Sequence, residues 1–153
     1  MAELKNTFSW SYSASEDFDA CRRKRYWSKY GMWGGWDRNA SPEQKAAYRR
    51  NKMSNRYSSQ GEAAEQAVMW MLKEHQAGRP ADPDTAYETI AKPLLNQAWK
   101  ESLSGRWKND PKRVTCLHEH YYAPDGSDPA KNREWTSEVI NTVKTCLTHF
   151  KNH

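Results

Sequence analysis

The sequence predicts a mainly α protein, with about five helices in one compact domain and at most a small strand or hairpin near residues 113–122. Two observations lead to this fold class. Apolar residues recur at the three- and four-residue spacing of amphipathic helices. Capping residues, glycines and prolines mark the ends of these segments. Only KRVTCLHEHYY, residues 112–122, alternates in the manner of a strand and is rich in β-favouring residues.

The first helix is expected from about residue 14 to residue 30. Ser13 and Glu16 have the spacing of a capping box, in which each side chain accepts a backbone N–H at the start of the helix. Gly31 supplies a left-handed stop. Arg25 falls on the inward side of this helix, where it would need an acidic partner.

Two further helices follow. The second begins at SPEQ, where Ser41 is the cap and Pro42 occupies the first helical position. The third begins near residues 59–61 and continues through EAAEQAVMWMLKEHQA to Gly78. Its alanines and its larger apolar residues recur at helical spacing, so one side of it should be buried.

GRPADPD separates these helices from a fourth, at about residues 85–103. Pro93 should kink this helix, and Gly105 lies beyond its end. The turn APDGSDP then leads to a last helix that starts at Asp128 and Pro129. Its expected apolar face consists of Trp135, Val139, Val143, Cys146, Leu147 and Phe150.

Composition limits the possible classes of protein. The chain of 153 residues has 24 Lys and Arg against 19 Asp and Glu, which gives a net charge of +5. Mean hydropathy is low at −1.13, and no apolar run is long enough to span a membrane. The amino-terminal residues lack the apolar stretch of a secretory signal, and three separated cysteines suggest no disulfide framework. We therefore expect one soluble, cytoplasmic domain over residues 1–153 with reduced, inertly packed thiols.

SWSYSASEDFDACRRKRYW, residues 9–27, resembles the amino-terminal helix of the RecB-like branch of the PD-(D/E)XK nucleases. That helix follows a Ser and carries Cys-Pro-Arg-Lys, with aromatic residues near its end. Arg22 stands where the family has Pro. The matching positions here are Ser13, Cys21, Arg23, Lys24, Tyr26 and Trp27.

A second motif follows in the family's order. GEAAEQAV, residues 61–68, resembles a G-x-x-x-E motif in which Glu65 matches a residue that helps to hold the catalytic divalent metal. The resemblance therefore implies that Glu65 is a metal ligand, with Mg²⁺ or Mn²⁺ as the cofactor only if a nuclease core completes the site.

The family's catalytic Asp and (D/E)-x-K are not found after Glu65. Asp110-Pro111-Lys112 is the nearest sequence, but its central proline argues against a core strand. The resemblance thus implies the helical DNA-contacting part of a nuclease that does not cleave alone, acting in repair, recombination or phage defence. The chain is then either a fragment of a longer nuclease or a standalone remnant. Some relatives bind an iron–sulfur cluster, but the spacing of the three cysteines here predicts none.

The basic and aromatic residues have two compatible interpretations. Cations neutralise phosphates and rings stack on bases in nucleic-acid sites, whereas in an ordinary domain the rings pack inward and the charges are only solvated. The residues predicted to contact DNA are Arg22, Arg23, Lys24, Arg25, Tyr26, Trp27 and Lys29, followed by Arg49, Arg50, Lys52 and Arg56.

Two alternatives stay open. The Trp-rich segment could dock a partner protein, for which an aromatic patch without basic neighbours would be the sign. A complete small nuclease would need Glu65 together with acidic residues such as Asp84, Asp110 or Glu119. The histidines at positions 118, 120, 149 and 153 have spacings that permit metal ligation, but a structural or surface role is the favoured interpretation.

Overall fold

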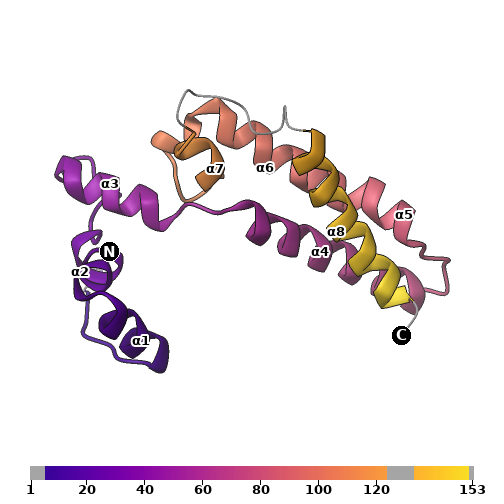
Figure 1. Cartoon of the computed structure of the whole chain (residues 1–153), viewed down its shortest axis with the longest axis horizontal. Helices are drawn as coiled ribbons and strands as arrows, with labels where there is room; N and C mark the ends of the chain where they lie inside the picture. Colours follow the sequence, from indigo (N-terminus) through magenta and orange to yellow (C-terminus); the bar gives the residue numbers. More distant parts are fainter. Residues whose placement is uncertain (1–5, 124–132, 152–153) are drawn as a thin grey trace. The chain divides into compact units, whose positions relative to one another are not determined.

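The computed structural model describes residues 6–123 and 133–151, and it confirms that the chain is mainly helical (Figure 1). Its contacts divide the chain into two compact units, Met1–Lys52 and Met53–His153. The single domain expected from the sequence stays a prediction.

The first unit has a break where the sequence predicts one long helix. Its elements are α1 (Tyr12–Ala20), α2 (Arg22–Tyr26), a π-helical turn η1 (Trp27–Gly31) and α3 (Pro42–Asn51). Cys21 lies between α1 and α2 with extended backbone angles, φ −165° and ψ 105°. Its sulfur accepts a hydrogen bond from the Lys24 N–H at 3.4 Å, so Cys21 ends one helix and caps the next.

The caps of α1 and α3 differ in how well the sequence predicts them. The predicted capping box at Ser13 is wrong. Ser11 caps α1 instead, because its hydroxyl accepts a hydrogen bond from the Ala14 N–H at 3.2 Å. The Ser41 cap of α3 is confirmed. Its hydroxyl accepts from the Gln44 N–H at 3.2 Å, and the Gln44 side chain accepts from the Ser41 N–H at 3.0 Å.

The second unit contains a long helix, an interrupted helix and a carboxy-terminal helix. Its elements are α4 (Arg56–Gln76), α5 (Pro83–Ala86), η2 (Tyr87–Ala91), α6 (Lys92–Ser104), η3 (Arg106–Lys108), α7 (His118–Tyr121) and α8 (Arg133–Lys151). The third predicted helix therefore begins earlier than expected, because Asn55 caps it by accepting from the Ser58 N–H at 2.9 Å. The expected helix start at Asp128 lies outside the described residues.

The helix around Pro93 is irregular, as expected. α5, η2 and α6 follow one another without a loop, and the π-helical turn η2 ends two residues before Pro93. Pro93 cannot donate to the preceding turn, and its ring crowds the carbonyl four residues earlier. A wider turn accommodates both effects. Gly105 ends α6 in the left-handed region with φ 69°, which glycine adopts without steric cost.

The core of the second unit lies where α8 packs along α4 and η2, an arrangement visible for α4 and α8 in Figure 1. Val143 and Leu147 of α8 are almost completely buried, as predicted. Cys146 and Phe150 are exposed, so their predicted place on the apolar face is wrong. The α4 and α5–η2 residues of this core are Ala63, Ala64, Ala67, Met71, Ala86, Tyr87 and Ala91.

The segment at residues 113–122 forms no strand, and none occurs elsewhere among the described residues. Leu117 makes a single bridge with Ser54, and the next residues form α7. The backbone N–H of Leu117 donates instead to the Ser102 hydroxyl at 2.8 Å. Without a neighbouring strand, the alternating pattern has no ladder to join.

The cysteines occupy three different environments. Cys116 is buried, and burial raises the pKa of its thiol to about 11. Cys21 and Cys146 are exposed, so the prediction that their thiols are packed and inert is wrong. No disulfide links the three.

Two glycines give a matched test of local packing. A Cβ at Gly35 would lie within 3.0 Å of the Gln44 carbonyl oxygen and of Tyr48 Cβ, whereas one at Gly61 in α4 would meet nothing within 4 Å. We expect Gly35→Ala to lower the free energy of unfolding by about 1–3 kcal/mol. Gly61→Ala should raise it by about 0.5–1 kcal/mol. Urea unfolding followed by tryptophan fluorescence measures both, and a neutral Gly35→Ala would contradict the close approach.

Candidate nucleic-acid interface

The net charge of the chain belongs entirely to the first unit. Residues 1–52 contain 11 Lys and Arg against 6 Asp and Glu, a net charge of +5, whereas residues 53–153 contain 13 of each. Such an asymmetry is a sequence signal for a polyanion-binding part. The total net charge conceals it, because the second unit contributes nothing to the sum.

Helix α2 carries three of the predicted cations on exposed side chains. Arg22, Arg23 and Lys24 are all exposed. Lys24 Nζ lies 2.9 Å from Asp17 Oδ1, and this hydrogen bond raises the pKa of Lys24. The Arg22 guanidinium lies 5.0 Å from the centre of the Phe18 ring, within cation–π range.

Arg25 is half-buried, as expected, but it has no acidic partner among the described residues. Its Nη2 donates to the Ser9 carbonyl at 3.4 Å, and its Nε is buried without an acceptor. The cation therefore helps to hold the segment before α1 against α2.

Phe8, Trp10, Phe18 and Arg22 form a cluster that we call the N-terminal patch. Phe8 and Trp10 are stacked, with centroids 6.1 Å apart and planes 17° apart. Trp10 meets Phe18 edge to face at 5.7 Å. Phe8 is 77% exposed and Trp10 53%, although apolar rings usually bury most of their surface. Neither ring is among the residues predicted from the sequence to contact DNA.

A second group of rings, which we call the Trp36 cluster, consists of Trp33 and Trp36 from the turns before α3 and Tyr48 within α3. Trp36 meets Trp33 at 5.0 Å and Tyr48 at 5.7 Å, both edge to face. Lys52 Nζ lies 5.7 Å from the Tyr48 ring centre. Tyr48 is buried, so it packs α3 against the interior of the first unit. Trp36 is 47% exposed, so its ring is accessible from solvent.

The remaining predicted residues of the first unit are placed less uniformly. Tyr26 is 54% exposed and meets Trp27, which is half-buried, edge to face at 5.4 Å. Lys29 and Arg49 are half-buried, and Arg50 is exposed.

Arg56 belongs to the second unit and is engaged in its fold. Its guanidinium donates to Glu138 of α8 at 3.1 Å and to the Tyr57 hydroxyl at 2.6 Å. Its backbone N–H donates to Glu119 at 3.0 Å. The hydrogen bond to Tyr57 is the main cause that raises the pKa of Arg56. These contacts join α4 to α7 and α8.

Glu65 lies near the middle of α4, and its side chain is exposed to solvent. Within residues 6–123 and 133–151, no three His, Cys, Asp or Glu side chains come together as a metal-binding group. Glu65 as a ligand of Mg²⁺ or Mn²⁺, in a site completed by a nuclease core, stays a prediction. Glu65 lies in the second unit and the cations of residues 22–52 in the first, so a site shared by both stays a prediction.

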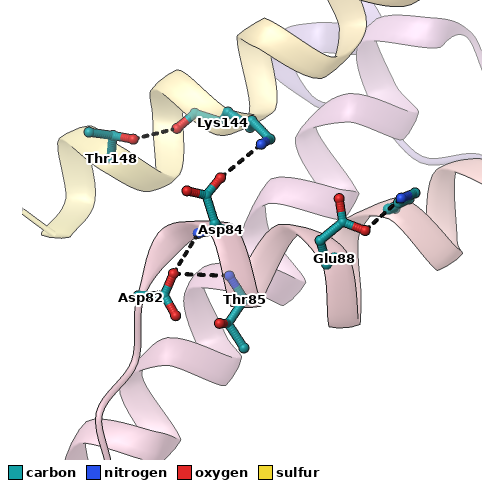
Figure 2. Close-up of polar contacts among 7 residues, drawn as sticks. Asp82, Asp84, Thr85, Glu88, Lys144 and Thr148 are labelled. Atoms are coloured by element: carbon teal, nitrogen blue, oxygen red, sulfur yellow. Dashed lines mark hydrogen bonds and ion pairs between the residues drawn. The ribbon is translucent and has the colours of Figure 1, made fainter.

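The other carboxylates considered for catalysis have partners of their own. Asp84 Oδ1 lies 2.8 Å from Lys144 Nζ, a contact between α5 and α8 that Figure 2 shows. Asp110 lies 4.0 Å from Arg113, and Glu119 accepts from the backbone of Arg56.

The histidines also have neighbours. His118 is exposed beside the Tyr122 ring, and His120 Nδ1 lies 2.7 Å from the Ser102 hydroxyl. His149 is exposed, and His153 lies outside the described residues.

No protein-family profile, curated protein sequence or solved structure matches this chain. Among the residues that the structure describes, no helix has the length and apolar character needed to cross a membrane.

Proposed function

We propose that this protein binds nucleic acid through its first unit. The observation that carries the proposal is the coincidence, in one 52-residue unit, of the whole net charge of +5 and of exposed aromatic rings that pack on the rings contacted by cations. Phosphates attract such a unit at long range, and each neutralised phosphate releases counterions. Exposed rings next to the cations supply stacking surfaces for bases.

The placement of the rings favours this proposal over docking of a partner protein. A protein-docking patch would be an aromatic surface without basic neighbours. Here Arg22 lies over Phe18 and Lys52 lies over Tyr48, in the same clusters that expose Phe8, Trp10 and Trp36. In a nuclease of the kind that the sequence resembles, the chain would contribute DNA contacts. Glu65 would be one metal ligand there, and a nuclease core would have to complete the metal centre, so the proposal concerns binding and not cleavage.

Fluorescence anisotropy tests this proposal directly. The full chain is titrated into labelled single-stranded and double-stranded DNA of about 20 nucleotides, at salt from about 50 to 200 mM. We expect binding whose logarithm of affinity falls linearly with the logarithm of salt concentration. Poly-glutamate of similar length is the control for unspecific attraction, and it should bind more weakly because it has no bases to stack. Absence of salt-dependent binding to either DNA would refute the proposal.

A further inference from the structure

The second unit contains a cavity that the proposed nucleic-acid function does not use. Its volume is about 210 Å³, and it lies between α4, α6 and α8, with Leu117 also in its wall. The apolar part of its wall consists of Leu95, Ala98, Trp99, Leu117, Val139 and Ile140. A concave space of this size with mostly apolar walls can take a small ligand.

The charged residues that line the cavity are all cations. Arg56 and Lys92 contribute to its wall, and no Asp or Glu does so among the described residues. The remaining polar residues of the wall are Ser59, Tyr87, Asn96 and Thr136. A space with apolar walls and two cations is complementary to a molecule that is apolar at one end and anionic at the other.

The two cations differ in how firmly they are held. The Arg56 side chain is 16% exposed and lies 3.1 Å from Glu138, with the Tyr57 hydroxyl on its other nitrogen. It is therefore fixed in place before any ligand arrives. Lys92 pairs with Glu88 one helical turn away, and both side chains are about half exposed. Exposed pairs of this kind contribute little, so Lys92 can turn to a ligand at small cost.

We propose that this cavity binds a small aromatic carboxylate, whose ring lies among Trp99, Leu117 and Ile140 and whose carboxylate is held by Arg56 and Lys92. The size supports a fused pair of rings, because an apolar cavity of about 150 Å³ holds one benzene molecule. A hydrogen bond from an Arg or Lys side chain to a carboxylate is charge-assisted and stronger than one between neutral groups.

Calorimetric titration of the full chain with 2-naphthoate tests the proposal, and its neutral isostere 2-naphthamide serves as the control. For a ligand of this size we expect saturable binding with a dissociation constant of about 0.1–1 mM. The amide should bind about tenfold more weakly, because it fills the same space without the charge. Equal affinity for the acid and the amide, or no saturable binding of the acid, would overturn the proposal.

Three variants locate the ligand. Lys92→Gln should weaken naphthoate binding about threefold to tenfold, whereas Lys100→Gln, which removes the same charge from an exposed position of α6, should leave it unchanged. Val139→Phe should abolish binding by filling the cavity. If Val139→Phe does not fold, shifts of the Val139 and Ile140 methyl signals of the wild type on adding naphthoate locate the ligand instead. Equal effects of the two lysine substitutions, or shifts confined to residues outside the cavity, would contradict the assignment.

Discussion

Replacing Arg22, Arg23 and Lys24 together by Gln is expected to weaken nucleic-acid binding about tenfold to a hundredfold at about 0.1 M salt. These side chains are exposed on α2, so each can approach a phosphate without first leaving a buried site. The plot of log affinity against log salt should lose about 2 to 3 units of slope, because each lost phosphate contact removes about 0.7 to 0.9. Anisotropy titrations of the variant and the wild type measure both quantities.

The control variant removes the same charge from the second unit. Lys73, Lys100 and Lys112 are exposed, and their replacement by Gln lowers the net charge of the chain equally. If binding depends on the first unit, this control should retain most of the affinity. Equal losses in the two triple variants would mean that only the overall charge matters, which contradicts an interface on α2. Circular dichroism checks that both variants remain helical.

The largest expected effect on stability is that of Leu147→Ala in α8. Leu147 is completely buried against the core of the second unit. Removing its side chain loses the transfer free energy of the buried atoms and leaves a cavity, so the free energy of unfolding should fall by about 2–5 kcal/mol. Urea unfolding followed by circular dichroism measures this change.

Leu72 in α4 provides the matched control, because the same substitution is made at a side chain that is 38% exposed. Leu72→Ala should cost less than about 1 kcal/mol. If the two substitutions cost the same, the packing of α8 on α4 described here is wrong.

Much of the helical fold can be predicted from the sequence where the local signal is clear. Ser41 is followed by Pro42, a residue suited to the first helical position, and the observed helix begins there although Asn39 could also serve as a cap. Gly105 ends α6 because it is the residue that adopts the left-handed angle at that point. The start of α1 could not be predicted in this way, because serines alternate through this segment and Ser11 is as good a cap as Ser13.

The errors arise where tertiary context decides. The Cys21 break is an exception, because the sulfur accepts from the Lys24 N–H only three residues along the chain, which is a local contact. The alternating segment around Leu117 is favourable for a strand, but its one backbone partner is the short stretch at Ser54. Cys146 sits on the margin of the apolar stripe of α8, so its exposure depends on how that helix is rotated against α4.

The sequence predicts the exposed cations of the candidate site, but it does not predict the exposed rings of Phe8 and Trp10. The basic run of α2 is visible in the sequence and is exposed in the structure. Arg56 looked equivalent to those cations, yet its contact with Glu138 depends on a residue 82 positions away. Phe8 and Trp10 precede the first helix, and no periodic pattern distinguishes exposed rings from buried ones there.

The central claim is that residues of the first unit contact nucleic acid, and backbone amide NMR of the full chain during titration with an oligonucleotide tests it most directly. We expect chemical-shift changes at residues 22–29 and 48–52 and at the indole N–H signals of Trp10 and Trp36, with residues 56–123 and 133–151 nearly unaffected. Changes confined to the second unit, or an unchanged spectrum at DNA in excess, would contradict the account.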